Sequence, residues 1–162
     1  RLGSISQKSR GSELQDIVAA WRAGGLKTEI YKNIEQLIWE KLLCNVTLSG
    51  PCSIFGCNVK ELYNNEEYWT FALNCMQEAY SVGLAIGVPF SFEDPIVYVS
   101  DFAKRVGSAK PSMLQDFESK KKTEIDFING AIPPLAAKSK IPTPFNDHVC
   151  RIIYDAERQI KS

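Results

Sequence analysis

Two groups of polar side chains in this sequence are of types that can do acid–base or ligand-binding chemistry. In residues 34–49, an amine at Lys41 and an amide at Asn45 are one helical turn apart. Much further along the chain, a hydroxyl at Ser112 and a carboxyl at Glu124 stand on either side of the run KKK. A lysine can donate a proton, a carboxylate can accept one, and amides and hydroxyls can orient a ligand oxygen. These four side chains are therefore candidates for a catalytic site.

Lys41 and Asn45 fall on the same face of the predicted helix 34–49. At about 100° per residue, Asn45 lies about 40° from Lys41. Their neighbours within about 60° are the apolar residues Ile34, Leu37, Ile38, Cys44 and Leu48. The polar, solvent-facing side is predicted around Gln36, Glu40 and Thr47. Burying an ammonium is costly unless it is paired. Either the lysine extends its apolar stem to reach water, or this face lines a cleft.

Ser112 and Glu124 also fit a purely local role at the starts of helices. Ser112 and Gln115 have the spacing of a capping box. Glu124 falls in the first turn of the next predicted helix, where its charge offsets the helix dipole. Two helix N-termini that face one pocket would instead bind an oxyanion or a carboxylate. The local and the ligand-binding roles are compatible, because capping fixes the direction of a side chain.

The composition argues against several classes of partner. Nineteen Lys and Arg balance nineteen Asp and Glu, so no net charge favours nucleic acid or an anionic membrane. The run KKK at 120–122 is interpreted as a solvated helix end. No apolar run approaches the roughly 18–20 residues that span a bilayer. We therefore predict neither a nucleic-acid partner nor a membrane partner.

The cysteines and the histidine do not have the spacing of a metal site. The five cysteines form no C-x-x-C pair, and His148 is the single histidine. Several of these cysteines lie in apolar helical stretches, where a thiol behaves as a small hydrophobic group. We therefore predict no metal, and free thiols of this kind suit a reducing, cytoplasmic location.

The fold class predicted from hydrophobic periodicity is mainly α. The first 32 residues read as a short α/β remnant, with a helix over 12–23 and a strand over 26–31. Residues 33–162 read as a bundle of about six helices, over 34–49, 66–86, part of 91–107, 112–120, 124–138 and 143–160. Gly50-Pro51 is expected to break or kink the first of these, and Pro133-Pro134 to kink the fifth.

Three motifs resemble the C-terminal substrate domain of the ketopantoate reductase (2-dehydropantoate 2-reductase) family. They are WEKLLCN at 39–45, SMLQDFESKKKTEIDFINGAI at 112–132 and IPTPFND at 141–147. They match, in order, the family patterns W-x-K-x-x-x-N, S-M-x-Q-D with T-E-I-D-x-I-N-G, and T-P-x-N. The resemblance implies a helical bundle like the C-terminal domain of 6-phosphogluconate dehydrogenase. It also implies that residues 1–32 are the last strand–helix–strand unit of a Rossmann-type NADP-binding domain.

Enzymes of that family reduce 2-dehydropantoate to pantoate with NADPH, on the route to pantothenate and coenzyme A. The resemblance implies that Lys41 is the general acid, and that Glu124 binds the substrate hydroxyl and helps to hold the lysine in register. Asn45 and Ser112 match substrate-binding positions. Ser49 stands where the family commonly has a second asparagine, so the ketoacid bound here could differ. A related reductase of another 2-ketoacid therefore stays open as an alternative.

The sequence contains no G-x-G-x-x-G, the phosphate-binding motif of dinucleotide domains. We therefore expect NADP(H) to be bound mainly by an N-terminal domain absent from this chain, and the chain alone to be inactive. A second alternative is a non-catalytic helical module that dimerises or binds a partner, with Trp39, Trp69 or Phe90 in an exposed patch. Apolar residues within 14–31 are also expected to be exposed, which would favour a homodimer or other self-association.

Overall fold

The computed structural model describes residues 2–3 and 11–160 of the chain. The described part is mainly α, as predicted, and carries two short 3-10 turns. Its elements are α1 (Gly11–Ala23), α2 (Ile34–Phe55), α3 (Val59–Asn64), α4 (Glu66–Ala85), α5 (Pro95–Val106), α6 (Ser112–Glu118), η1 (Ile125–Phe127), η2 (Asn129–Ala131), α7 (Ile132–Ser139) and α8 (Pro144–Ile160).

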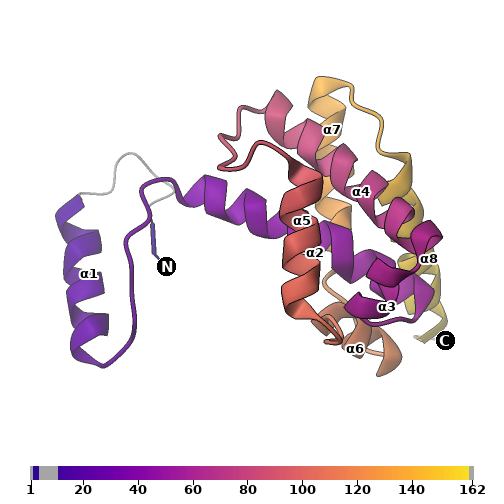
Figure 1. Cartoon of the computed structure of the whole chain (residues 1–162), viewed down its shortest axis with the longest axis horizontal. Coiled ribbons are helices and arrows are strands. Elements are labelled where there is room, and N and C mark those ends of the chain that lie inside the picture. Colours follow the sequence, from indigo (N-terminus) through magenta and orange to yellow (C-terminus); the bar gives the residue numbers. More distant parts are fainter. Residues whose placement is uncertain (1, 4–10, 161–162) are drawn as a thin grey trace.

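Helices α2 to α8 form one bundle, and α1 stands apart from it at the N-terminal end of α2 (Figure 1). Leu2 and Ile30 form a single parallel β-bridge beside α1. The Leu2 N–H donates to the Glu29 carbonyl at 2.8 Å, and the Tyr31 N–H donates to the Leu2 carbonyl at 2.6 Å. The predicted strand over 26–31 is therefore reduced to one bridge within the described residues.

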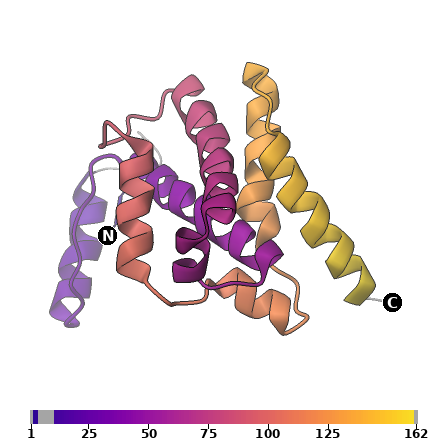
Figure 2. The same ribbon diagram turned by 45° about the vertical axis from the view of Figure 1, so that its right-hand side comes forward.

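Helix α2 runs through the middle of the bundle and packs against α3, α4, α5, α6 and α8 (Figure 1). Turned by 45°, the bundle shows α4, α7 and α8 side by side (Figure 2). Asn33 caps the start of α2 by accepting the Gln36 N–H at 3.1 Å. Gly56 ends the helix in the left-handed conformation, with φ 62°.

The sequence predicted a break or a kink at Gly50-Pro51; helix α2 continues through these residues, so it does not break there. A proline inside a helix removes one hydrogen bond and costs roughly 3 kcal/mol. Every residue from Val46 to Ser53 is buried. Packing on all sides of this segment therefore outweighs the cost of the proline.

The predicted orientation of α2 is wrong in its first half. Glu40 is buried and Lys41 is exposed, whereas the helical wheel placed them the other way round. The Glu40 carboxylate accepts the Ser91 backbone N–H at 2.8 Å and the Gln36 side-chain N–H at 2.9 Å. Thr47 is buried too, and its hydroxyl donates to the Leu43 carbonyl at 2.6 Å. Polar groups satisfied in this way can enter the core, which a wheel based on residue type does not detect.

Helix α3 lies between the predicted helices 34–49 and 66–86, where no helix was predicted. Asn58 accepts the Glu61 N–H at 3.0 Å, and the Glu61 carboxylate accepts the Asn58 N–H at 2.8 Å. This reciprocal capping box stabilises the start of a helix only six residues long. The spacing of the two residues was visible in the sequence as N-x-x-E.

The predicted helix over 124–138 is divided into η1, η2 and α7. Pro133 and Pro134 lie in the first turn of α7, where a helix tolerates residues without an N–H. They therefore start a new helix at Ile132 and do not kink a continuous one.

A buried polar network joins α2, α4, η2 and α8. The Asn129 side-chain amide donates to the Val46 carbonyl at 3.1 Å and to the Asn146 side-chain oxygen at 3.0 Å. Asn146 in turn donates to the Cys75 carbonyl at 3.0 Å and to the Glu78 carboxylate at 2.7 Å. The same carboxylate accepts two backbone N–H groups in the first turn of α8, at 2.8 and 3.0 Å. Asn129 and Asn146 are 0% exposed, so this network fixes how the helices meet.

Gly50 is required by the close approach of α2 to this network. A Cβ at position 50 would lie 2.4 Å from Asn129 Oδ1 and 2.6 Å from Val149 Cγ1. Gly50→Ala is expected to destabilise the protein by about 2 kcal/mol, although alanine is the better helix former. Urea denaturation would measure the loss. Gly83→Ala is the matched control, because its Cβ would meet the edge of the Phe90 ring, which can shift, and would come no closer than ordinary contact to the Trp39 ring. Equal or higher stability of Gly50→Ala would contradict the expectation.

Candidate functional site

Asn45, Ser49, Ser112 and Glu124 line one hollow of about 190 Å³ in the bundle. Asn45 and Ser49 lie one turn apart on α2. Ser112 is the first residue of α6, and Glu124 immediately precedes η1. The other lining residues are mainly apolar: Leu48, Val59, Phe102, Val106, Ala109, Lys110, Pro111 and Ile128. The structure thus brings together four of the five site residues predicted from the sequence.

Lys41 is the predicted site residue that does not line the hollow. It lies one turn before Asn45 on α2 and is exposed, so its amine reaches water, which is the first of the two alternatives that the sequence left open. One turn of a helix separates the two Cα atoms by about 6 Å along the axis. The flexible four-carbon stem of a lysine can cover that distance. Lys41 is therefore an exposed residue one helical turn from Asn45, which lines the hollow.

The turn that carries Glu124 is held in place by α8. The Thr123 N–H and hydroxyl both donate to Glu157 Oε1, at 2.7 and 2.8 Å. On the other side of Glu124, the Tyr154 hydroxyl donates to Asp126 Oδ1 at 2.7 Å. This hydrogen bond lowers the pKa of the Asp126 carboxyl and raises the pKa of the Tyr154 hydroxyl. Two contacts to one helix thus fix the backbone that directs the Glu124 side chain.

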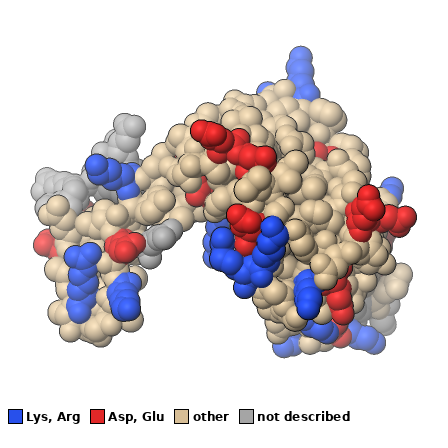
Figure 3. Space-filling model, in the orientation of Figure 1, with Lys and Arg blue, Asp and Glu red and all other residues tan. Residues whose placement is uncertain are grey.

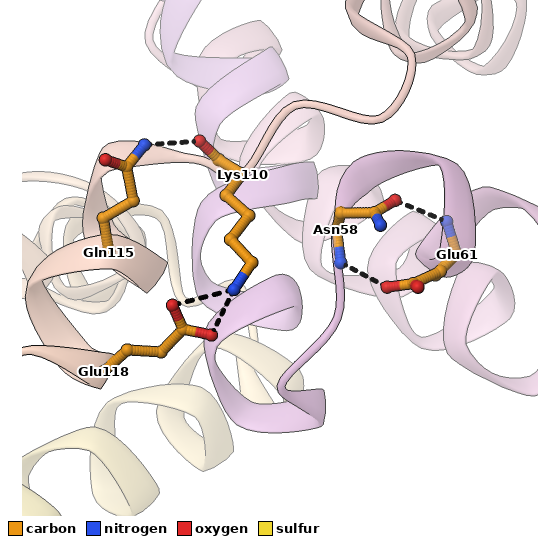
Figure 4. Close-up of polar contacts among 5 residues, drawn as sticks. All are labelled: Asn58, Glu61, Lys110, Gln115 and Glu118. Carbon is orange, nitrogen blue, oxygen red and sulfur yellow. Dashed lines mark hydrogen bonds and ion pairs between the residues drawn. The ribbon is translucent and has the colours of Figure 1, made fainter.

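The sequence suggested that Ser112 caps its helix, but in the structure it does not. Pro111 occupies the cap position, and no side chain there bonds to the backbone of α6. The Gln115 side chain donates instead to the Lys110 carbonyl at 2.9 Å (Figure 4). Ser112 is exposed, and its hydroxyl does not serve as a cap.

Lys110 is a lining residue that the sequence interpretation missed. Its ammonium contacts both oxygens of Glu118 on α6, at 2.6 and 2.9 Å (Figure 4). The signal that could have found it was its position two residues before Ser112. Further basic side chains gather over α5, which carries Lys104 and Arg105 in its last turn (Figure 3).

The thiols near the hollow are apolar packing groups. All five cysteines are free and buried. Burial raises the pKa of the Cys44 thiol to about 12, and it also raises the pKa of Cys57. Thiols held neutral in this way are poor nucleophiles and poor metal ligands. No group of His, Cys, Asp or Glu within residues 2–3 and 11–160 could hold a metal ion. In the same part of the chain, no helix combines the length and apolar character needed to cross a bilayer.

Three comparisons place the chain among known proteins. The family model described as "Ketopantoate reductase PanE/ApbA C terminal" matches residues 33–157. The chain is 31% identical over 149 residues to the 2-dehydropantoate 2-reductase of Streptococcus pyogenes serotype M3, covering 91% of this chain and 46% of the relative. The chain therefore spans about half the length of the curated relatives that it matches.

Solved structures share the fold. The PanE/ApbA family ketopantoate reductase from Ralstonia eutropha JMP134 superposes with a TM-score of 0.85 and 24% identity, covering 91% of this chain and 49% of that chain. D-mandelate dehydrogenase with NADH and anilino(oxo)acetate gives a TM-score of 0.84 and 22% identity, covering 99% and 52%. Since the family model covers most of the sequence, this chain belongs to the ketopantoate reductase family and corresponds to its C-terminal domain.

Proposed function

We propose that this chain is the substrate-binding half of an NADPH-dependent 2-dehydropantoate 2-reductase. The observation that carries the proposal is the hollow. It gathers an amide, two hydroxyls and a carboxylate from three segments that are far apart in the sequence, namely Asn45, Ser49, Ser112 and Glu124. The names of the curated relatives support the same reaction.

The nicotinamide cofactor supplies a hydride to the ketone carbon of the substrate. The residues of this chain then have to stabilise and protonate the ketone oxygen. In the proposal, Lys41 extends along α2 and donates that proton. Asn45 and Ser112 orient polar oxygens of the ketoacid, and Glu124 accepts a hydrogen bond from the substrate hydroxyl.

Exposure of Lys41 suits this role. The protein does not bear the cost of a buried ammonium before substrate arrives. A bound ketoacid would displace water from the hollow beside the lysine, which strengthens the attraction between the ammonium and the developing oxyanion.

Ser49 is the residue that favours a different 2-ketoacid as an alternative substrate. It is buried, it lines the hollow, and its hydroxyl is shorter than the asparagine amide of the family pattern. The space that it leaves would admit a different 2-ketoacid. D-mandelate dehydrogenase, which shares the fold, was solved with anilino(oxo)acetate, a bulky oxo acid.

Residues 1–32 are proposed to be the last strand–helix–strand unit of the nucleotide-binding half, with residues 33–162 as the substrate domain. The parallel bridge between Leu2 and Ile30 supports this division. So does the position of α1, which stands away from the bundle (Figure 1). NADP(H) would be bound mainly by the preceding part of such a reductase.

Turnover tests the proposed function. This chain alone, mixed with NADPH and 2-dehydropantoate, is expected to oxidise no NADPH. The same chain joined to a nucleotide-binding half, as in its relatives, is expected to turn over, and a panel of 2-ketoacids would identify the preferred substrate. Rapid NADPH oxidation by the chain alone would contradict the division of labour. No turnover of any 2-ketoacid by the joined, folded chain would contradict the reductase.

The second candidate, a helical interaction module, is favoured by the predicted apolar surface within 14–31 and not by the tryptophans and Phe90. Trp39 is buried, and Trp69 and Phe90 pack against the core, so they form no exposed patch. The exposed apolar side chains near the N-terminus are Ile17, Trp21, Leu26 and Ile30. Such a surface favours association, and we include a homodimer in the proposal.

Sedimentation tests that association. The chain is expected to self-associate as its concentration rises, and Trp21→Glu is expected to shift it towards monomer. A clean monomer at high concentration would contradict this. The free, buried cysteines support a reducing compartment, so the proposal places the protein in the cytoplasm.

A further inference from the structure

The hollow has an electrostatic requirement that Asn45, Ser49, Ser112 and Glu124 do not meet. A 2-ketoacid is an anion, and Glu124 would repel its carboxylate. Among the described residues that line the hollow, the charged ones are Glu124 and Lys110. Lys110 is therefore the lining residue with the charge to offset this repulsion.

The side chain of Lys110 is engaged in a contact that a ligand can displace. Its ammonium contacts both carboxylate oxygens of Glu118, at 2.6 and 2.9 Å. The two side chains are 48% and 44% exposed, and exposed ion pairs contribute at most about 1 kcal/mol. Another carboxylate can thus replace that of Glu118 at little cost.

The backbone of Lys110, in contrast, is held in place. The Gln115 side chain donates to the Lys110 carbonyl at 2.9 Å, and Figure 4 shows this bond and the ion pair on opposite sides of the residue. The Val59 N–H donates to the neighbouring Ala109 carbonyl at 3.2 Å, which ties this segment to the start of α3. The base of the side chain is therefore fixed at the edge of the hollow, while its charged end can move.

We propose that Lys110 binds the carboxylate of the ketoacid, which replaces the Glu118 carboxylate as the partner of the Lys110 ammonium. This inference rests on the proposed function and adds a specificity determinant to it. Lys110 selects 2-oxo acids over uncharged carbonyl compounds, and Glu118 holds the ammonium in position while the hollow is empty. Ser112, two residues further on, supplies a hydroxyl to the same end of the ligand.

The test compares the affinity of this chain for 2-dehydropantoate with its affinity for the corresponding uncharged amide, by protein NMR titration. Lys110→Met is expected to weaken binding of the acid roughly tenfold and to leave binding of the amide unchanged. Lys104→Met is the matched control, because Lys104 is also exposed and paired, to Asp101 at 3.6 Å, but lies outside the hollow. Thermal unfolding confirms that each variant is folded.

A second variant tests the proposed exchange at Glu118 and does not depend on the Lys110 substitution. Glu118→Gln removes the competing carboxylate, so the acid is expected to bind at least as tightly as it does to the unaltered chain. Equal affinity of Lys110→Met and the unaltered chain for the acid would overturn the inference alone. Weaker binding of the acid to Glu118→Gln would also overturn it. If the unaltered chain binds neither compound, the proposed function fails, and the inference fails with it.

Discussion

Lys41→Met is expected to lower kcat/KM for ketoacid reduction about a thousandfold, in a chain joined to its nucleotide-binding half. Methionine has a similar length but no proton to donate, so the ketone oxygen would take its proton from water. Because Lys41 is exposed and outside the packed core, the variant should keep its thermal stability. Steady-state NADPH oxidation, read beside a thermal melt, measures both quantities.

Two further variants separate proton donation from charge. Lys41→Arg keeps a positive charge, but arginine does not release its proton at neutral pH, so activity should stay low. Lys60→Met removes an exposed lysine on α3 that does not line the hollow, and should leave activity unchanged. A Lys41→Met variant that keeps nearly full kcat/KM would exclude this lysine as the general acid.

Asn146→Ala is expected to destabilise the fold by about 3 kcal/mol, which corresponds to a fall in Tm of roughly 6–12 °C. The asparagine is fully buried and bonds to Asn129, Cys75 and Glu78. Alanine would leave buried polar groups without partners and would also leave a small cavity. Thermal and urea unfolding of this chain would measure the loss.

Asn74→Ala is the matched control for that loss. Asn74 is on α4, like Glu78, but its amide makes one exposed hydrogen bond, to the Thr70 carbonyl at 3.0 Å. Its replacement should change the free energy of unfolding by less than about 0.5 kcal/mol. Similar small effects for both variants would show that the buried network is not what holds α8 to α4.

The network also explains why part of the family motif concerns folding. Asn129 belongs to the T-E-I-D-x-I-N-G pattern and Asn146 to T-P-x-N. The structure buries both amides in the core, away from the hollow. Residues that a sequence pattern groups together can therefore lie in different places, one lining the hollow and the other fixing the helices around it.

Helix positions followed from the sequence where the signals were local. The helices at 66–85 and 95–106 begin at asparagine or aspartate caps, and Pro95 occupies the first turn of the second. Predicted helix ends were wrong where tertiary packing decides them, as at Pro51, which lies in a fully buried segment of α2. The placement of Lys41 on the buried face was wrong for the same reason, since one of the partners that bind the buried Glu40 carboxylate is Ser91, which is distant in sequence.

The sequence predicted which residues form most of the candidate site, but not the contacts that hold them in place. The family resemblance identified Asn45, Ser49, Ser112 and Glu124, and the structure places them around one hollow. Periodicity could not show that α8 holds the Glu124 turn, because those contacts join residues about thirty positions apart. It also could not show that Lys110 lines the hollow.

The most direct test of the account is a crystal structure of the joined reductase with 2-dehydropantoate and the oxidised cofactor. We predict the ketoacid in the hollow, with its ketone oxygen about 3 Å from the Lys41 ammonium and its polar oxygens bonded to Asn45 and Ser112. A ketoacid bound outside the hollow, or a Lys41 side chain directed into bulk water with the ligand in place, would contradict it.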